Sequence, residues 1–483
     1  MTLGVLAVAS EAAPLVKTGG LADVVGALPA ALAPHGIAVT TLLPCYPAVR
    51  AAAKGARALR SWPALFGGPA RLLAARHEGL PLLLLDAPHL YDRPGGPYLG
   101  PDGRDWPDNA LRFAALSLAA AEVAREGAGR ARFDLVHAHD WQAGLVGAYL
   151  RHAPGRRVPV VFSIHNLAFQ GHFPAGIFPA LGLPPEAFAT EGVEYYGGVG
   201  FLKAGIWYAD RITTVSPTYA AEIATPEGGM GLDGLLRARS AVLCGILNGL
   251  DTRIWDPATD PLLPARFSAA DPAPRAANKR ALQARFGLAQ DAAAPLFAFI
   301  GRLAWQKGVD LLLAALPALL DWGGQLALLG TGEAALEQAA RDAAAAHPGR
   351  VGAAIAFEEP LAHLLHGGAD CVVVPSRFEP CGLTQLCALR YGAPPLVSRV
   401  GGLADTVVDA NEAALAAGVA TGLMVAPGSA EALSAGLRRA AALWRDRPAW
   451  ARIQANAMAA DVSWGRSAAR YAALFRGLLA PPP

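Results

Sequence analysis

Gly19-Gly20-Leu21-Ala22-Asp23 is the stretch of this sequence that decides the fold, because the same five residues recur as Gly401-Gly402-Leu403-Ala404-Asp405. Each copy follows a short apolar run, residues 3–9 and residues 394–398, and opens an apolar pattern of helical spacing. A glycine pair between a strand and a helix lets a ligand approach the backbone, and the helix N-terminus behind it favours anions. Two such turns, one near each end of the chain, predict two nucleotide-binding halves that face one ligand.

The composition is that of a large globular protein. The chain has 483 residues, of which 53% are hydrophobic and 17% are charged, and its formal net charge is +2. This length predicts two or more domains. Because the net charge is small, we expect no nucleic-acid partner. The sequence has no run of about 18 uncharged apolar residues, so we also expect no membrane partner.

The cysteines and the N-terminus indicate a cytoplasmic protein. The sequence has five scattered cysteines with neither CxxC nor zinc-ligand spacing, which is typical of reduced thiols: Cys45, Cys244, Cys371, Cys381 and Cys387. The apolar N-terminus has no basic region and runs directly into Ser10-Glu11, which favours a first strand over a signal peptide.

Short aliphatic runs alternate with longer amphipathic stretches, a pattern typical of parallel sheets covered by helices on both faces. The expected strands are residues 3–9, 38–43, 80–85, 134–137, 158–163, 211–215, 242–247, 296–300, 325–329, 351–357, 371–374 and 395–398. The expected helices are residues 21–33, 108–125, 141–151, 201–209, 309–320, 333–346, 383–391 and 403–408, and further helices finish the chain.

The alternation breaks once, at residues 249–275, which are rich in Pro, Asp and Ala and indicate a linker. We therefore predict an α/β protein with two doubly wound Rossmann-like domains facing a deep inter-domain cleft, residues 1–248 and 249–460. Residues 461–483 form a C-terminal helical segment, and the proline tail at 481–483 cannot continue a helix.

Three polar groups in the first half follow predicted strands or precede predicted helices. Lys17-Thr18-Gly19-Gly20 reads either as a phosphate or sugar contact or as an ordinary glycine-rich turn with a solvated lysine. His137-Ala138-His139-Asp140 has no partner cluster for a metal, so we favour a polar group lining a cleft, with Asp140 its main member. Satisfied strand-end histidines are the alternative there. His165-Asn166 also ends a strand, and a site role and a structural role both stay open.

Two groups in the second half carry stronger signals. Arg302 and Lys307 follow a predicted buried strand and come just before a predicted helix. Two cations at the start of a helix are better explained as ligands of a diphosphate than as surface charges exposed to solvent. Residues 375–384 follow a very apolar strand and present Glu379 to a sugar hydroxyl. The backbone of the next segment is placed to cradle phosphate, and Cys381 is expected to pack rather than react, because no histidine base is beside it. That segment comprises Gly382, Leu383 and Thr384.

Two absences from the sequence limit the function. No D-x-D occurs, so a two-aspartate metal clamp for a nucleotide sugar is not available at that spacing. Residues 11–20 do not supply the G-x-G-x-x-G that an NAD enzyme needs after its first strand.

Taken together, these motifs resemble bacterial glycogen synthase and plant starch synthase, the ADP-glucose-dependent α-glucan synthases of glycosyltransferase family 5 with the GT-B fold. The resemblance covers residues 3 to about 470. It rests on residues 17–29 (KTGGLADVVGALP), 86–95, 137–141, 201–205, 247–249, 302–308, 376–385 and 401–407.

The resemblance implies a role for each candidate residue. On the donor side, Arg302 and Lys307 neutralise the ADP phosphates, and Glu379 lies against the glucose ring. Around the sugar and phosphates it implies Lys17, Gly19, Gly20, Cys381, Gly382, Leu383 and Thr384. On the glucose and acceptor side it implies Asp140, His165, Asn166, Asn248 and Tyr98, while Phe357 stacks on adenine. It also implies domain closure and a C-terminal helix, from near Trp464, that crosses back to the first domain.

The implied reaction is transfer of glucose from ADP-glucose to the non-reducing 4-hydroxyl of an α-1,4-glucan with retention, releasing ADP and needing no cofactor or metal. The acceptor is glycogen or a malto-oligosaccharide. Because only Glu379 and Asp140 are plausible carboxylates, we favour front-side transfer in which the leaving phosphate helps to deprotonate the acceptor. A nucleotide-sugar epimerase and a non-catalytic glucan-binding protein are the alternatives. The sequence departs from the family pattern at Gly301, at Met230 and at residues 357–359.

Overall fold

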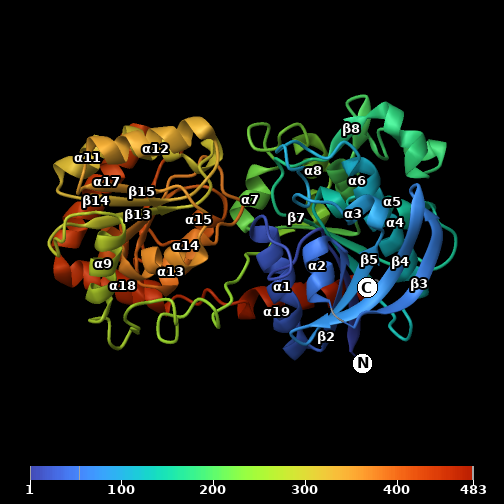
Figure 1. Ribbon diagram of the computed structural model, residues 1–483, viewed down its shortest axis with the longest axis horizontal. Coiled ribbons are helices and arrows are strands. Elements are labelled where there is room, and N and C mark those ends of the chain that lie inside the picture. Colours follow the sequence, from blue (N-terminus) through green and yellow to red (C-terminus); the bar gives the residue numbers. More distant parts are fainter. Residues whose placement is uncertain (1, 54, 481–483) are drawn as a thin grey trace. The chain divides into compact units, whose positions relative to one another are not determined.

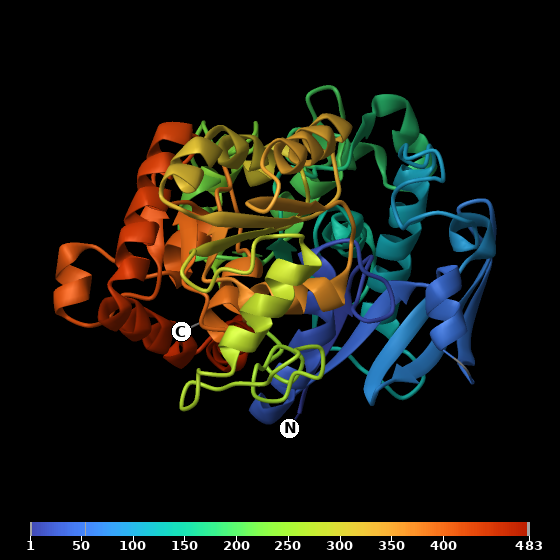
Figure 2. The same cartoon turned by 60° about the vertical axis from the view of Figure 1, so that its left-hand side comes forward.

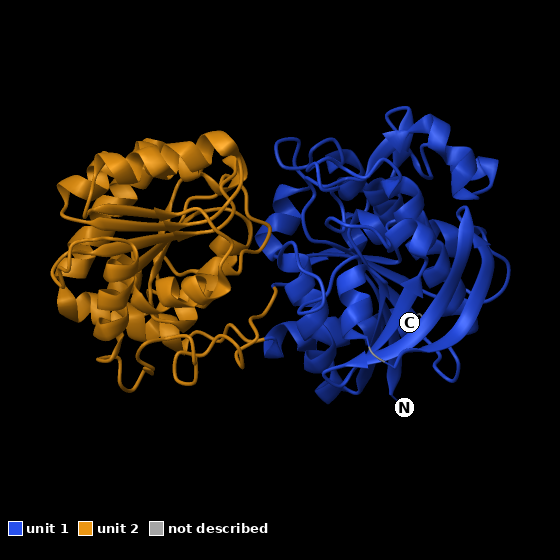
Figure 3. Cartoon of the chain, viewed as in Figure 1, with its two compact units in different colours: residues 1–247, 464–483 blue, residues 248–463 orange. Residues whose placement is uncertain are grey.

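The computed structural model describes residues 2–53 and 55–480, which fold as two compact units (Figures 1 and 3). The first unit is residues 1–247 with 464–483, and the second is residues 248–463. Helix α19 (Gly465–Leu479) belongs to the first unit, where its Tyr471 and Phe475 pack with Leu28 and Leu32 of α1. The predicted proline tail at 481–483 lies outside the described residues.

The first unit is built on a nine-stranded sheet with the strand order β12-β11-β7-β6-β1-β2-β5-β4-β3. Its strands are β1 (Leu3–Val8), β2 (Ile37–Pro44), β3 (Arg57–Leu65), β4 (Gly68–His77), β5 (Leu80–Asp86), β6 (Leu135–His139), β7 (Val160–Ile164), β11 (Arg211–Thr214) and β12 (Leu243–Gly245). The seven strands from β12 to β5 run parallel, as predicted.

The antiparallel hairpin β3–β4 at the edge of this sheet was not expected. Phe66 and Gly67 both have positive φ, 49° and 93°, as the tight turn of a two-residue hairpin requires. Much of β3 is exposed, so its sequence lacks the continuous apolar run by which the parallel strands were found.

Helices and a small antiparallel sheet complete the first unit. The helices are α1 (Gly20–Leu32), α2 (Pro47–Ala52), α3 (Pro88–Tyr91), α4 (Asn109–Glu126), α5 (Val146–His152), α6 (Phe201–Tyr208), α7 (Pro217–Glu222), α8 (Asp233–Ala238) and α19. The helix predicted over 141–151 starts as a 3-10 turn, Trp141–Ala143, before α5. The small sheet has the order β8-β10-β9, with β8 (His172–Pro174), β9 (Glu194–Tyr195) and β10 (Gly198–Gly200).

The second unit contains a six-stranded parallel sheet with the order β15-β14-β13-β16-β17-β18. Its strands are β13 (Leu296–Ile300), β14 (Gln325–Leu329), β15 (Val351–Ala354), β16 (Cys371–Val374), β17 (Pro395–Ser398) and β18 (Leu423–Val425). The strand predicted over 351–357 was too long, because β15 ends at Ala354 and leaves Phe357 in an exposed loop.

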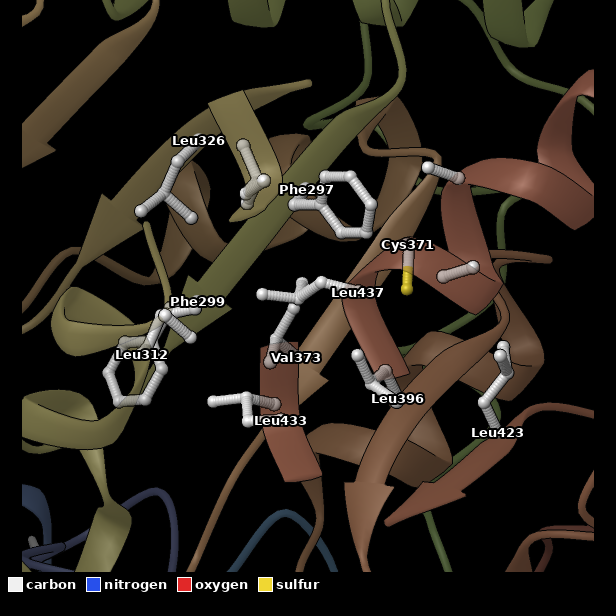
Figure 4. Packing of buried hydrophobic residues seen from close by; sticks show 14 of the residues in the cluster. Phe297, Phe299, Leu312, Leu326, Cys371, Val373, Leu396, Leu423, Leu433 and Leu437 are labelled. Atoms are coloured by element: carbon white, nitrogen blue, oxygen red, sulfur yellow. The ribbon is translucent and has the colours of Figure 1, made fainter. Parts of the chain in front are cut away.

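Helices cover both faces of this sheet (Figures 1 and 2). They are α9 (Arg275–Arg285), α10 (Val309–Ala314), α11 (Leu316–Asp321), α12 (Ala334–Ala346), α13 (Glu359–Gly368), α14 (Thr384–Arg390), α15 (Gly401–Thr406), α16 (Glu412–Ala416), α17 (Ala430–Arg445) and α18 (Arg447–Ala459). The helix predicted over 309–320 is divided into α10 and α11 because Pro317, which has no N–H, cannot continue α10 and instead lies in the first turn of α11. On one face, Phe297, Val373 and Leu396 pack against Leu433 and Leu437 of α17 (Figure 4).

The parallel strands of each large sheet reverse their order once, and this reversal determines where a ligand site is expected. In the first unit the reversal lies between β1 and β6, and in the second between β13 and β16. Ligands of open α/β sheets bind beyond the carboxyl ends of the strands at such a switch point. The loops that follow these four strands are therefore where a ligand site is expected in each unit.

Candidate functional site

At the switch point of the second unit, a lysine and a glutamate from different loops meet. Lys307 follows β13, and its Nζ lies 2.5 Å from Oε2 of Glu379, which follows β16. Ser376 Oγ donates to the same carboxylate oxygen at 2.9 Å. Only 6% of Glu379 is exposed, and this cation and this hydroxyl stabilise its buried charge.

Two glycines allow the loops of this site to approach so closely. Gly308 has φ +67°, and a Cβ there would lie 2.1 Å from the carbonyl oxygen of Pro375. A Cβ at Gly402 would lie 2.2 Å from the carbonyl oxygen of Cys381, and the Gly402 N–H donates to the Glu379 carbonyl at 3.1 Å. The second glycine pair, Gly401-Gly402, thus supports the backbone of the loop that carries Glu379. The sequence alone did not predict this role.

The cations around Lys307 differ in how far they are engaged. Arg377 donates to both carboxylate oxygens of Asp310, at 2.8 and 2.6 Å, and this hydrogen bonding is the main cause that lowers the pKa of Asp310. Arg302 is exposed, and its guanidinium donates to Gln306 Oε1 at 3.3 Å. Among residues 2–53 and 55–480, no carboxylate forms an ion pair with Arg302, so its charge is available to a ligand anion.

The remaining candidates of this unit surround Glu379. Gly382 has φ +76° and precedes α14, whose first residue, Thr384, follows Leu383. Burial raises the pKa of the Cys381 thiol to about 12, which agrees with a packing role. The backbone of Asn248 hydrogen-bonds that cysteine, while the buried Asn248 Oδ1 has no partner among the described residues.

In the first unit, a buried carboxylate that the sequence analysis did not select organises the first Gly-Gly loop. Glu11 follows β1 and is 2% exposed. It accepts hydrogen bonds from the Tyr98 hydroxyl and from the backbone N–H and Oγ1 of Thr18, the last at 2.7 Å. Thr18 immediately precedes Gly19, so these bonds fix the glycine pair at the start of α1. The available signal was a lone carboxylate at the end of a buried strand, which is not a motif.

Lys17 already has a partner within its own loop. Its Nζ lies 2.7 Å from Oδ1 of Asp23 in α1, and both side chains are about one third exposed, at 35% and 31%. An ion pair as exposed as this one contributes little to stability, so Lys17 can exchange Asp23 for a ligand phosphate.

The His-Ala-His-Asp group forms a hydrogen-bonded cluster with the loop after β7. His137 Nε2 lies 2.6 Å from Ser163 Oγ, and His139 Nδ1 lies 2.9 Å from His165 Nε2. Burial lowers the pKa of His137 to about 3 and of His165 to about 4, so both rings are neutral near pH 7. His137 also contacts Tyr471 of α19, with ring centroids 5.4 Å apart, which is the arrangement of a strand-end packing histidine.

Asp140 is the most perturbed carboxyl of the site. It is 8% exposed, and burial raises its pKa to about 7 although the His165 N–H donates to its Oδ1 at 2.7 Å. Its φ of +55° is a strained value for a residue with a side chain, at a cost on the order of 1–3 kcal/mol. The neighbouring Asn166 accepts from the Ala168 N–H at 3.1 Å and is partly exposed.

The predicted residues thus fall into two sets, each within one unit. The first unit brings Lys17, Gly19, Gly20 and Tyr98 together around Glu11, and Asp140, His165 and Asn166 around the end of β6. The second brings together Asn248, Arg302, Lys307, Glu379, Cys381, Gly382, Leu383 and Thr384. Phe357 follows β15, which is separated from β13 by β14, and its ring is 82% exposed, so its stacking on adenine stays a prediction.

A cavity of about 590 Å³ in the first unit lies away from these residues. Its lining includes Arg157, Asp210 and Val242, which precede β7, β11 and β12, so it opens at the amino ends of the strands. The candidate residues follow the carboxyl ends, and the cavity is not the site described above.

Comparison with known proteins decides the family. Residues 4–238 match the model of the starch synthase catalytic domain, and residues 282–457 match that of the group 1 glycosyl transferases. Glycogen synthase of Rhodopseudomonas palustris strain BisA53 is 59% identical over 98% of this chain and 97% of its own. The chain belongs to the glycogen synthase and starch synthase family. A second family member, glycogen synthase of Acidiphilium cryptum, is 61% identical over 98% of this chain and 99% of its own.

Solved structures agree with this family assignment. The catalytic domain of starch synthase IV from Arabidopsis thaliana, bound to ADP and acarbose, superposes with a TM-score of 0.90 at 32% identity, covering 99% of this chain and 100% of that one. Sucrose-phosphate synthase from Thermosynechococcus elongatus has a TM-score of 0.60 at 20% identity, covering 99% of each chain, and shows the fold alone. The predicted resemblance and the GT-B fold class with two Rossmann-like units are confirmed.

A membrane-spanning helix and a metal-binding cluster are both absent from residues 2–53 and 55–480. None of their helices is both long and apolar enough to cross a membrane. Within the same residues, no group of three or more His, Cys, Asp or Glu side chains is placed to hold a metal ion.

Proposed function

We propose that this protein is a retaining glucosyltransferase that moves glucose from ADP-glucose to the non-reducing 4-hydroxyl of an α-1,4-glucan in glycogen synthesis. The observation that carries the proposal is the relationship to curated glycogen synthases, 59% identical over 98% of the chain. The starch synthase IV structure, which holds ADP and acarbose, supports a nucleotide product and a glucan acceptor.

The second unit supplies the positive charge that the departing ADP requires. Lys307 and the exposed Arg302 follow the same strand, which supports a role for both cations in neutralising the diphosphate as the bond to the anomeric carbon breaks. Charge stabilisation of this kind is stronger in a closed, drier site, so we expect the two units to close over the donor.

Glu379 is better suited to hold a sugar hydroxyl than to attack the anomeric carbon. Its Oε2 accepts hydrogen bonds from Lys307 and from Ser376. These two donors withdraw electron density from the carboxylate and make it a weaker nucleophile. Asp140 is a buried carboxyl whose pKa of about 7 keeps a large fraction protonated near neutrality, which makes it a poor permanent nucleophile. These two observations favour front-side transfer, in which the leaving phosphate takes the acceptor proton.

The first unit binds glucose and the acceptor in this proposal. Glu11 holds the Gly19-Gly20 loop against the sugar through Thr18, and His165 and Asn166 present polar atoms to acceptor hydroxyls. Neither a cofactor nor a metal is needed, because the leaving group is a stable diphosphate and the cations are side chains. None of the five cysteines, all of which lie within the described residues, forms a disulfide, which suits a cytoplasmic place of action.

The test is release of ADP from ADP-glucose with and without glycogen. We expect release that depends on glycogen, together with radiolabelled glucose in a product that an α-1,4-specific glucosidase digests. An epimerase would consume the donor without acceptor, and a glucan-binding protein would release no ADP. A clear preference for UDP-glucose would overturn the donor assignment, and a trapped glucosyl–Glu379 adduct would overturn front-side transfer.

A further inference from the structure

The side chain of Arg377 reaches from the loop after β16 to the loop after β13. Its Nη1 donates to the Trp305 carbonyl at 2.7 Å and to Asp310 Oδ1 at 2.8 Å. Its Nη2 donates to Asp310 Oδ2 at 2.6 Å, and the guanidinium lies over the Trp305 ring, 4.6 Å from the ring centroid. Only 16% of the Arg377 side chain is exposed. We call this arrangement of Arg377, Trp305 and Asp310 the arginine clamp.

The clamp holds the turn on which Lys307 lies. This 3-10 turn comprises Trp305–Lys307, and the Trp305 carbonyl accepts from the Gly308 N–H at 3.2 Å as well as from Arg377. The Trp305 N–H is fixed too, because it donates to Glu333 Oε1 at 2.9 Å. The N–H and the carbonyl of Trp305 are therefore both hydrogen-bonded, and a shift of the turn that presents Lys307 would break at least one of these bonds.

Further hydrogen bonds join the same two loops. The Arg377 N–H donates to the Gln306 carbonyl at 2.8 Å, and Gln306 Nε2 donates to the Phe378 carbonyl at 3.2 Å. Gln306 immediately precedes Lys307, and Phe378 immediately precedes Glu379. The neighbours of the Lys307–Glu379 ion pair are thus bonded to each other, and Arg377 takes part with both its backbone and its side chain.

The charge of Arg377 is balanced inside the clamp. Its hydrogen bonds to Asp310 are the main cause that lowers the pKa of that carboxyl, so Asp310 is ionised near pH 7. Because Asp310 neutralises it, Arg377 does not compete with Lys307 for a ligand diphosphate. A planar guanidinium donates to two carboxylate oxygens and a carbonyl in one fixed geometry, which an ammonium group does not reproduce. These features indicate a role for Arg377 in geometry rather than in direct contact with a ligand.

We propose that Arg377 is a positioning residue for glucosyl transfer, which holds the turn of Lys307 at the distance from Glu379 that the nucleotide-sugar donor requires. This inference rests on the proposed function and deepens it by naming a residue that acts on the donor site through another side chain. In the clamped arrangement Lys307 Nζ lies 2.5 Å from Glu379 Oε2. A misplacement of about 1 Å can lower the rate of an enzyme on the order of 10²-fold, so loss of the clamp should be easy to measure.

The first test compares two variants of Arg377 with the wild type. For Arg377→Ala we expect kcat to fall on the order of 10²-fold. Arg377→Lys keeps the charge but not the planar fork, so its kcat should also stay well below that of the wild type. The KM for glycogen should not change in either variant, because the clamp belongs to the unit that binds the donor. Wild-type kcat in Arg377→Lys overturns the proposal, since charge alone would then be enough.

Arg445 provides a matched control in the same unit. Its guanidinium lies over the Trp322 ring, 4.9 Å from the centroid, and its Nη2 donates to the Trp322 carbonyl at 2.9 Å. Trp322 precedes β14, so this contact lies at the amino ends of the strands, away from the candidate site. Arg445→Ala should keep wild-type kcat, and urea unfolding shows that each variant folds. Equal losses of kcat in Arg445→Ala and Arg377→Ala overturn the proposal, because the effect would then be general destabilisation.

A double variant shows whether Arg377 acts through Lys307. In Lys307→Ala the turn no longer presents an ammonium group, so adding Arg377→Ala should leave the already reduced kcat unchanged. A separate structural role predicts that the two losses multiply, and this result overturns the proposal. Asp310→Asn keeps the shape of the side chain but gives up one acceptor oxygen. It should reproduce part of the loss, and it replaces Arg377→Ala in this comparison if that variant does not fold.

Chemical labelling tests the clamp independently of activity. Acetic anhydride modifies lysines at rates that depend on their exposure and hydrogen bonding, and mass spectrometry measures the extent at each lysine. In Arg377→Ala, Lys307 should be acetylated faster than in the wild type, while Lys17 of the other unit keeps its rate. An unchanged rate at Lys307 overturns the proposal even if the enzyme is active. A wild-type chain that releases no ADP, with Lys307 still labelled faster in Arg377→Ala, would instead refute the proposed function alone.

Discussion

Lys307 Nζ and Glu379 Oε2 lie 2.5 Å apart although 72 positions separate the two residues in the sequence. They meet because β13 and β16 are neighbours at the strand-order reversal of the second unit. Lys307 is a cation suited to a diphosphate, and Glu379 is a carboxylate suited to a sugar hydroxyl. The two partners of this ion pair therefore match the two parts of a nucleotide-sugar donor.

Lys307→Ala should lower kcat by about 10²–10³, because losing one preorganised donor costs roughly 2.7–4 kcal/mol of barrier. The measurement is the initial rate at saturating ADP-glucose and glycogen, with urea unfolding to show that the variant folds. Arg341→Ala, which removes a cation from an exposed i,i+4 pair of the same unit, is the control and should keep wild-type turnover. A kcat within threefold of the wild type would remove Lys307 from the chemistry.

The hydroxyl of Thr18 should matter through Glu11. Thr18→Val deletes the 2.7 Å bond to the buried carboxylate, at a cost of about 1–3 kcal/mol for the unsatisfied group. Because the Gly19-Gly20 loop then loses an anchor, kcat/KM for ADP-glucose should fall about tenfold or more. Thr18→Ser keeps the hydroxyl and should stay near wild type. If both variants lose activity equally, the methyl group and not the hydrogen bond positions the loop.

The buried strands of this protein could be predicted from sequence, and its half-exposed elements could not. The strands predicted over 325–329, 371–374 and 395–398 coincide with β14, β16 and β17, because each is a short apolar run buried on both faces. The hairpin β3–β4 and helix α13 (Glu359–Gly368) lack such runs, since each turns one side to solvent. Phe357 was placed in a strand for its apolar character, although Ala354 ends β15.

Among the site residues, those with a local sequence signal could be predicted, and those defined by tertiary contacts could not. Loops after buried strands drew attention to Arg302, Lys307, Glu379 and Asp140. Glu11 was missed because its partners, Thr18 and Tyr98, come from different segments, and only the folded chain shows that they converge on one carboxylate. Likewise, no local signal distinguishes a glycine that meets a ligand from one that meets the protein's own backbone.

Asp140→Asn should change how stability depends on pH. Burial raises the pKa of Asp140 to about 7 from its ordinary 3.8, so between these pH values the folded protein holds a proton that the unfolded chain has lost. This contribution to the free energy of unfolding is present below pH 4 and is lost as the pH rises to 7. Asn carries no such proton, so the variant should gain stability relative to wild type over that range, by at most about 4 kcal/mol.

Urea unfolding of both proteins at pH 4.5, 6 and 8 measures this difference. The buried histidines have the opposite sign: their lowered pKa values mean that stability falls as the pH drops below about 6.5. They are present in both proteins and cancel in the comparison. A difference that stays constant from pH 4.5 to 8 would mean that Asp140 ionises at an ordinary pH in the folded state.

The two copies of Gly-Gly-Leu-Ala-Asp should respond differently to the same substitution. A Cβ at Gly19 has no atom within 4 Å, and the φ of −161° suits any residue, so Gly19→Ala should fold with wild-type stability. A Cβ at Gly402 meets the Cys381 carbonyl at 2.2 Å, so Gly402→Ala should lose about 1–3 kcal/mol and displace the Glu379 loop. Gly477→Ala in α19, also in open space, should be neutral or stabilising by up to about 1 kcal/mol.

Activity then shows what Gly19 faces. If the donor approaches this backbone, Gly19→Ala should raise the KM for ADP-glucose while its unfolding curve stays that of the wild type, because the methyl group occupies space that only the ligand needs. Gly402→Ala should lose kcat together with stability, since its effect runs through the Glu379 loop. An active, unperturbed Gly19→Ala enzyme would mean that the first glycine pair only turns the chain into α1, and the donor contact would then have to lie elsewhere in that loop.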